Sequence, residues 1–405
     1  MQREGGVSPA SIRGPLSPPQ SAMTPRRTTI LLLAPLKKMS GNYSTAVRLR
    51  YHFENAGYQC LMEETKTFLN NQSFQEYIST RHVKFVLSLH AYHSGIILTG
   101  CPVPYAVILG GTDVHDYSKD PEKFELMRTV LHRASCPVQY LPMFQRNPET
   151  PKISRPEISC SDIAIIPQAV CTCPSSFSLQ NYFRRMGVMT FKGQTDVVTS
   201  GGQTDVVTSG TQTDVVTSGG PTGISEVSIF LVVGGIRAVK DPLFLIQAFS
   251  DWHVNNEQSA YLVFLGPKIE EDYCQKFIQE VDRSPGVAYI DGVQLEDTHA
   301  AIRDSVALVN SSRSEGMASA ILEAMDVGTV VIARDIPANC DLIEHGHNGL
   351  LFHSPQDFVK LAELLLTSPD VRARLTKRAK EQVVSRHSMA TEQSAYLSLV
   401  QKFAV

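Results

Sequence analysis

The sequence predicts an α/β protein built from two Rossmann-like, doubly wound halves. Short apolar runs of strand length alternate with segments of helical periodicity along both halves, as expected for parallel sheets covered by helices. The chain has 405 residues and 42% hydrophobic content, enough for two buried cores of ordinary size. A threefold nonapeptide repeat at residues 193–219 separates the two patterns, which places a domain boundary around it.

The first 27 residues are expected to form a disordered tail. They contain five prolines and four arginines but one glutamate, and the prolines would interrupt the amphipathic helix that a transit peptide needs. The apolar run at 30–34 is too short for a membrane helix and is followed by Lys37 and Lys38, unlike a secretory signal. Eight scattered cysteines without a Cys-x-x-Cys pair indicate reduced thiols. We therefore expect a cytoplasmic protein, with secretion as the alternative.

The net charge and the length of the apolar segments disfavour two classes of binding partner, nucleic acid and the membrane interior. A formal net charge of −3 argues against general nucleic-acid binding, and no stretch approaches the roughly 20 apolar residues of a transmembrane helix. The sequence does not indicate the oligomeric state.

The first half, residues 28–170, is expected to begin with a buried strand at 28–34 and a helix at 43–57. Further strands are expected at 83–89, 105–109 and 163–166. Ligands of such sheets gather at the carboxyl ends of the strands. Function is therefore expected in the loops that follow them, at 39–42, 90–95, 110–113 and 167–170.

The second half, residues 225–405, shows the same alternation. Its strands are expected at 227–233, 260–264, 287–290, 307–310 and 330–333, and amphipathic helices at 355–405. Residues 171–224 form the linker. Its repeat, Gly-Gln-Thr-Asp-Val-Val-Thr-Ser-Gly, has the period of a calcium-binding β-roll, but each copy carries one aspartate and three short copies cannot bury a core. We interpret it as a flexible, dispensable insert, and the proline-rich segment 143–161 as a loop.

Two glutamates stand out in the second half. Glu315 and Glu323 lie eight residues apart where a small-residue loop opens an apolar helix, so on one helix both carboxylates could address a single ligand. The amides of Gly316, Met317 and Ala318 at the expected helix start suit an anion such as a pyrophosphate. Carboxylates accept sugar hydroxyls. Together these groups suggest a sugar nucleotide, whereas either glutamate alone could equally belong to a solvated helix face.

A second motif precedes this loop by about 75 residues. The chain leaves an expected strand through Gly234 and Gly235, which let the backbone approach a phosphate closely. Arg237 and Lys240 follow and could both reach that phosphate, the arginine as a bidentate donor and the lysine as a mobile point charge.

These two motifs resemble those of the retaining glycosyltransferases of group 1, which have the GT-B fold. The stretch 233–242 is similar to their diphosphate motif, and 311–333 to their Glu-x7-Glu signature. The resemblance implies a nucleotide-sugar cleft, with the donor on the second half and the acceptor on the first. It implies that Glu323 accepts the ribose hydroxyls and Glu315 those of the transferred sugar. It further implies metal-independent transfer from a nucleoside diphosphate sugar, expected to be a UDP-sugar, without a cofactor.

In the first half the resemblance is partial. Group 1 members commonly carry a histidine where this chain has Gly110, and its absence puts the usual acceptor-side contact in doubt, although some related enzymes carry Gly-Thr-Asp as here. His90 becomes the best remaining imidazole, ahead of His93, and Asp113 is a further candidate. Gly41 and Asn42 lie where the family has its glycine-rich first loop. Gln168 and Ala169 replace the Asn-Gly expected at the end of the first domain.

Other functions remain open at this point. A binding protein could keep the donor pocket and lack transfer activity, and a sugar phosphorylase or epimerase could use the same scaffold. A dinucleotide-dependent oxidoreductase is disfavoured, because no Gly-x-Gly-x-x-Gly follows any of the expected strands. The acceptor is not indicated by the sequence.

Overall fold

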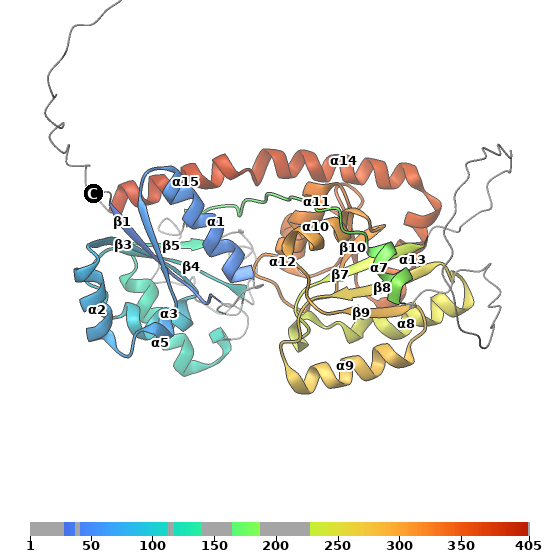
Figure 1. Ribbon diagram of the computed structural model, residues 1–405, viewed down its shortest axis with the longest axis horizontal. Coiled ribbons are helices and arrows are strands. Elements are labelled where there is room, and N and C mark those ends of the chain that lie inside the picture. Colours follow the sequence, from blue (N-terminus) through green and yellow to red (C-terminus); the bar gives the residue numbers. More distant parts are fainter. Residues whose placement is uncertain are drawn as a thin grey trace, which may run out of the picture.

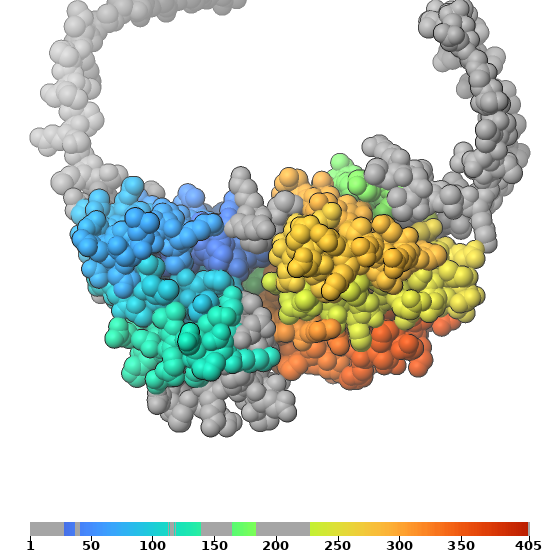
Figure 2. Space-filling view, turned by 90° about the horizontal axis from the view of Figure 1, so that it is seen from below, coloured from blue at the N-terminus to red at the C-terminus, as the bar shows by residue number. Residues whose placement is uncertain are grey.

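The computed structural model describes residues 28–36, 41–111, 113, 117–139, 164–186 and 227–403. Figure 1 shows two α/β halves side by side, and in the space-filling view of Figure 2 they form two lobes that meet along a seam. The expected tail, the 193–219 repeat and the loop at 143–161 lie outside the described residues.

The first half is a parallel sheet of six strands in the order β2-β1-β3-β4-β5-β6. Its strands are β1 (Thr29–Leu33), β2 (Gln59–Glu63), β3 (Val83–Leu89), β4 (Tyr105–Ile108), β5 (Cys136–Gln139) and β6 (Ala164–Ile165). Its helices are α1 (Gly41–Asn55), α2 (Asn71–Thr80), α3 (Ala91–Leu98) and α5 (Pro121–Arg133), with short 3₁₀ turns η1 (Thr65–Thr67) and η2 (Tyr117–Lys119). Helix α7 (Leu179–Met186) lies beside the second half in both views.

The second half repeats the architecture with the strand order β12-β11-β10-β7-β8-β9, again all parallel. Its strands are β7 (Ser228–Val233), β8 (Ala260–Leu265), β9 (Val287–Ile290), β10 (Ala307–Asn310), β11 (Val330–Arg334) and β12 (Leu350–Phe352). Its helices are η4 (Ala238–Lys240), α8 (Leu243–Asn255), α9 (Glu271–Arg283), α10 (Leu295–Arg303), α11 (Ser319–Val327), α12 (Pro337–Leu342), α13 (Pro355–Thr367), α14 (Pro369–Arg386) and α15 (Met389–Phe403).

The expected strands are confirmed to within one or two residues wherever the structure describes them. The strands at 83–89, 287–290 and 307–310 agree at both ends, and most of their residues are buried. Three strands were not anticipated. β2 and β12 lie at the sheet edges, where one side of the strand is unpaired. β2 mixes polar and apolar residues, and β12 has only three residues. β5 contains Pro137, and a proline within a short apolar run argues against predicting a strand there.

The last helix joins the two halves. α14 runs along the second half, and α15 continues from it onto the first (Figure 1). There Tyr396, Leu399 and Val400 are buried in the same apolar cluster as β1 and β3 residues such as Ile30 and Phe85. The end of the chain is therefore part of the first core. Among the described residues, no helix combines the length and the apolarity needed to cross a bilayer.

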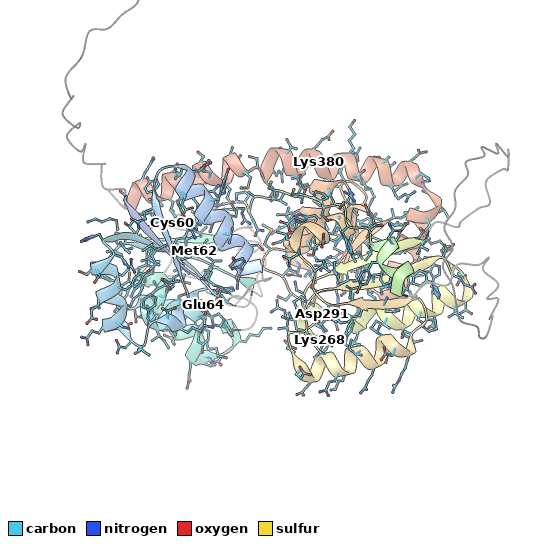
Figure 3. All side chains as sticks on the ribbon, viewed as in Figure 1. Cys60, Met62, Glu64, Lys268, Asp291 and Lys380 are labelled. Atoms are coloured by element: carbon cyan, nitrogen blue, oxygen red, sulfur yellow. The ribbon has the colours of Figure 1, made fainter. Side chains whose placement is uncertain are left out.

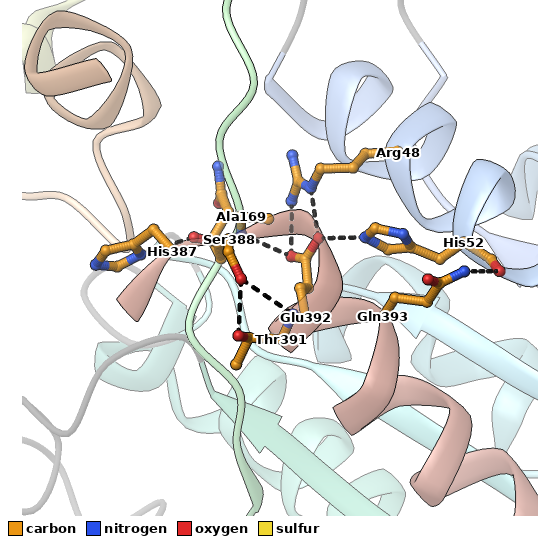
Figure 4. Close-up of polar contacts among 9 residues, drawn as sticks. Arg48, His52, Ala169, His387, Ser388, Thr391, Glu392 and Gln393 are labelled. Carbon is orange, nitrogen blue, oxygen red and sulfur yellow. Dashed lines mark hydrogen bonds and ion pairs between the residues drawn. The ribbon is translucent and has the colours of Figure 1, made fainter. Parts of the chain in front are cut away.

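Glu392 of α15 is the centre of a buried polar cluster that fastens this crossing (Figure 4). Its carboxylate accepts hydrogen bonds from Arg48 Nε at 2.8 Å, from His52 Nε2 at 2.8 Å and from the amide of Ala169 at 3.0 Å. Burial works to raise the pKa of Glu392, but His52 and Arg48 outweigh it and hold that pKa below its usual range. The cluster therefore depends on an ionised carboxylate.

The chain passes from the first half to the second after β6, and this segment is hydrogen-bonded close to Glu392. The segment that leaves the first half is bonded to the turn between α14 and α15: the Val170 amide donates to the His387 carbonyl at 3.0 Å, and His387 Nδ1 lies 2.7 Å from the Gln168 carbonyl. Both connections between the halves are thus fixed to each other next to Glu392.

Removal of the Glu392 charge should destabilise the protein. Glu392→Gln leaves Arg48 buried against a neutral group, and breaking a buried pair in this way costs about 3 to 5 kcal/mol. Glu54→Gln breaks a solvent-exposed pair with Arg50 on the same helix as Arg48 and should cost less than about 1 kcal/mol. Urea unfolding followed by circular dichroism measures both, and equal midpoints for the two variants would contradict the assigned role.

Candidate functional site

The carboxyl ends of the two sheets face each other. Figure 3 shows Lys268 and Asp291, which follow β8 and β9, on the edge of the second half that faces the first. The halves touch between the loop after β4 and the loop after β10. A Cβ atom added to Gly111 would lie 2.5 Å from the amide nitrogen of Gly316, and one added to Gly316 would overlap the Gly111 backbone. Neither glycine has a positive φ, so the close approach of the two backbones is what requires them.

Glu315 lies beside this contact with its carboxylate buried. Its Oε1 accepts hydrogen bonds from Lys240 Nζ at 2.5 Å, Ser312 Oγ at 2.6 Å and Asn310 Nδ2 at 3.1 Å. Burial works to raise the pKa of Glu315, but the Lys240 ammonium and the two polar side chains hold it below the usual range. The structure therefore brings together Glu315 and Lys240, from the two motifs that the sequence singled out.

The expected helix at Glu315 was placed too early. α11 begins at Ser319, so Glu315 is in the preceding loop and only Glu323 is on the helix. The sequence argument that a shared helix brings the two carboxylates together is therefore wrong, because residues 315–318 form an irregular, non-helical segment at the Gly111–Gly316 contact. Within the described parts of the chain, the amides of Gly316, Met317 and Ala318 donate no hydrogen bond.

Glu323 differs from Glu315 in having no partner. It is half-buried on α11, and among the described residues its carboxylate makes no hydrogen bond or ion pair. Burial raises its pKa to about 7, and the nearby Arg48 offsets only part of this effect. A carboxylate that is partly removed from water and has no partner is costly unless a ligand supplies hydrogen bonds.

The loop that carries Arg237 and Lys240 is held by groups that the sequence reasoning missed. Gly234 has φ +150°, a conformation that favours glycine, and η4 follows it. Asp241, next in the chain, has φ +47° and is clasped by Arg313 Nε and Arg334 Nη1, each at 2.8 Å from Oδ2. The position of Asp241 directly after the motif lysine is the one signal that could have found it.

Gly235 and Arg237 of this loop differ in their surroundings. A Cβ at Gly235 would lie 2.6 Å from the Ile269 side chain, which would have to move to make room for it. Arg237 is half-buried and makes no ion pair with any residue that the structure describes, in contrast to Lys240. The structure thus leaves the Arg237 guanidinium available to a ligand.

Three residues meet on the first half. Nδ1 of His90 lies 3.2 Å from Asp113 Oδ2, and Nε2 lies 3.2 Å from Asn42 Oδ1 at the start of α1. Asp113 is fully buried and also accepts hydrogen bonds from the amides of Gly110, at 3.0 Å, and Ala91, at 3.1 Å. Burial works to raise the Asp113 pKa, but His90 and the amides of Gly110 and Tyr92 hold it below its usual range. Gly41 begins α1 beside Asn42 and has open space around its Cα.

Comparison with known proteins adds sequence relatives. Residues 221–382 match the family Glycosyl transferases group 1. The chain is 32% identical over 372 residues to Glycosyltransferase 1 domain-containing protein 1 of Xenopus tropicalis, covering 92% of this chain and 97% of that protein. It is also 26% identical over 190 residues to Spore coat protein SA of Bacillus subtilis, covering 44% and 50% of the two chains.

Solved structures share the architecture. Anabaena Alr3699/HepE in complex with UDP and glucose superposes with a TM-score of 0.69 at 14% identity, covering 93% of this chain and all of that one. Sucrose-phosphate synthase from Thermosynechococcus elongatus gives a TM-score of 0.68 at 14% identity, covering 93% and 99%. The expected fold, GT-B with two Rossmann-like domains, is confirmed.

The contact between the two glycines can be tested by adding a methyl group. Gly316→Ala should force the two halves apart, because the new Cβ has only the Gly111 backbone to displace. Small-angle scattering should show a larger radius of gyration than for the wild-type protein. Gly41→Ala places the same group in open space and should leave the radius unchanged. An unchanged radius in a folded Gly316→Ala protein would contradict the close contact.

Proposed function

The chain belongs to the glycosyl transferases of group 1, and we propose that it transfers a glycosyl group from a UDP-sugar to an acceptor, with retention and without a metal ion. The observation that carries this proposal is the arrangement at the start of α11. Glu323 lacks a partner, and the amides of residues 316–318 donate no hydrogen bond within the described chain. Glu323 would accept the ribose hydroxyls, and the amides would hold the diphosphate.

Lys240 and Arg237 support the proposal that the donor diphosphate binds in front of α11. Lys240 is bonded to Glu315, but an ammonium has three donors and can bind a phosphate oxygen as well. Arg237, three residues earlier, offers a planar guanidinium for a bidentate contact. Together they would neutralise the negative charge that grows on the departing diphosphate, the task that a metal ion performs in other transferases. No cofactor is needed for such a transfer.

Glu315 would then contact the transferred sugar. Its Oε1 is occupied by Lys240, Ser312 and Asn310, and these bonds fix the carboxylate beside the contact between the halves. The fixed group can accept a sugar hydroxyl through its remaining lone pairs without reorganising. Retention would follow from attack on the face that the leaving diphosphate occupies, the diphosphate helping to deprotonate the acceptor. The acceptor would approach from the first half.

The choice of uridine is supported by a structural neighbour. Alr3699/HepE, which shares the fold, has been crystallised in complex with UDP-glucose. At 14% identity this likeness concerns the fold, so the base recognised by the present chain is part of the proposal.

Calorimetric titration of UDP, GDP and ADP tests the donor site. We expect selective binding of UDP, weakened at least about tenfold, or roughly 1.4 kcal/mol, by Glu323→Ala and by Arg237→Ala. Arg303→Ala removes an exposed cation of the same half that is paired with Asp304, and it should leave the affinity unchanged. Binding of none of the three nucleotides by folded protein would refute the proposal. Binding of GDP or ADP in place of UDP would refute the assigned base alone.

Donor affinity should depend on pH through Glu323. Its pKa is raised to about 7, and the ionised form is the one that accepts the ribose hydroxyls, so affinity should fall as pH decreases through 7. The fall should approach tenfold per pH unit well below the pKa. A UDP-sugar is the ligand to use, because the terminal phosphate of UDP itself titrates near pH 6.

Glu323→Gln provides the control for this titration, since it cannot ionise. Its affinity for the UDP-sugar should be lower than that of the wild type at pH 8 and nearly constant from pH 5.5 to 8. The same slope in both proteins would assign the pH dependence to another group.

A further inference from the structure

Three side chains of α11 form one stripe that faces the crossing segment, residues 168–172, which leads from the first half to the second. Ser319, Glu323 and Asp326 are spaced four and three residues apart, which places them on one side of the helix. At one end of the stripe, Gln168 Nε2 donates to Ser319 Oγ at 2.9 Å. At the other end, the amide and the hydroxyl of Thr172 donate to Asp326 Oδ2 at 3.1 and 2.5 Å. The crossing segment is therefore bonded to both ends of the stripe.

Glu323 lies between these two bonded ends. Ser319 and Asp326 are about 10 Å apart along the axis of α11, and the chain from Gln168 to Thr172 can span about 14 Å at most. The crossing segment therefore runs alongside the helix with little slack. Its two neighbours in the stripe are bonded to that segment, whereas Glu323 makes no hydrogen bond or ion pair within the described parts of the chain. Glu323 thus faces the crossing segment without being bonded to it.

Arg48 reaches the same place from the first half. Its Nε and Nη2 atoms donate to the two carboxylate oxygens of Glu392 at 2.8 and 3.2 Å, so the guanidinium is held by a bidentate contact. Glu392 also accepts the amide of Ala169, the second residue of the crossing segment, at 3.0 Å (Figure 4). Arg48 is therefore fixed beside the segment that Glu323 faces. In agreement with this placement, burial raises the pKa of Glu323 and the positive charge of Arg48 opposes the rise.

Other charged or titratable side chains around α11 have partners of their own. Lys380 of α14 is paired with Asp326, Glu392 of α15 with Arg48, Glu315 of the preceding loop with Lys240, and Arg334 of β11 with Asp241, while Nδ1 of His299 on α10 accepts the Cys173 amide. Within the described chain, Arg48 is thus the cation that acts on Glu323.

We infer that Arg48 is a positioning residue for the nucleotide-sugar donor: anchored to Glu392, its guanidinium places a fixed positive charge beside Glu323 and keeps that ribose-binding carboxylate ionised. The inference rests on the proposed function and adds to it a residue of the first half that acts without touching the ligand. A hydroxyl donates a stronger hydrogen bond to an ionised carboxylate than to a neutral one. The donor site of the second half is then complete only with the first half fastened to it through Glu392.

The pH dependence of UDP-sugar affinity tests this role. Arg48→Gln removes the charge and keeps an amide that can donate to Glu392, and Arg48→Met replaces it if that variant does not fold. Arg48→Lys retains the charge. His52→Asn is the matched control, because it removes another partner of the Glu392 carboxylate, at 2.8 Å, from the same helix. Calorimetric titration between pH 5.5 and 8, with the UDP-sugar that the wild type binds most tightly, gives the midpoint pH at which half of the maximal affinity is lost.

In Arg48→Gln the midpoint should rise by about half a pH unit or more, which lowers the affinity at pH 6 by about threefold or more. At pH 8 its affinity should stay within about twofold of the wild type, because Glu323 is then mostly ionised in both proteins. Arg48→Lys and His52→Asn should keep the wild-type midpoint. In the Glu323→Gln background, Arg48→Gln should have no further effect at any pH.

An unchanged midpoint in a folded protein without the Arg48 charge would overturn the inference. An equal loss of affinity at every pH, the same shift in His52→Asn, or a further loss in the Glu323→Gln background would also overturn it, because each shows that Arg48 acts through the structure of the crossing and not through Glu323. A wild-type protein that binds no UDP-sugar would overturn the proposed function itself.

Discussion

The ion pair between Lys240 and Glu315 is the interaction on which the site is built. A carboxylate buried beside a loop is unfavourable unless charge and hydrogen bonds compensate it, and Lys240, Ser312 and Asn310 supply both. The pair joins the turn after β7 to the loop after β10. Because the Asp241 side chain is bonded to Arg313, which also belongs to the loop after β10, the two loops form one rigid unit.

Hydrogen bonds from α11 connect the second half, which contains this unit, to the first half. The side chain of Gln168, from the segment that leaves the first half, donates to Ser319 Oγ at the first residue of α11, at 2.9 Å. The next residue, Ala169, is bonded to Glu392, and Glu392 binds Arg48 of α1. Arg48 in turn lies close enough to influence Glu323. One polar network therefore links the crossing between the halves to α11 and to Arg48, and movement of one half would change the surroundings of Glu323.

Much of this arrangement could be predicted from the sequence, and the exceptions have physical causes. Buried strands such as β3 and β10 reveal themselves as apolar runs, and Glu315, Glu323, Arg237 and Lys240 reveal themselves by motif and spacing. The start of α11 could not be predicted, because Met317 and Ala318 suit a helix as well as a loop, and the contact of Gly316 with Gly111 decides between them.

The first half shows the same limit more sharply. Gly110 in sequence is simply a missing histidine, and only the three-dimensional structure shows that the His90 ring fills its place. The partners of Glu315, Asn310 and Ser312, precede it in the chain but carry no pattern of their own. Residues that act by positioning others are recognised through contacts, which spacing along the chain does not encode.

A crystal structure of the protein with an intact UDP-sugar would test the account most directly. The account predicts the diphosphate at the amides of residues 316–318 within hydrogen-bond distance of Lys240, with the ribose hydroxyls on Glu323 and the transferred sugar at Glu315. A donor bound elsewhere, or a ribose without contact to Glu323, would contradict it.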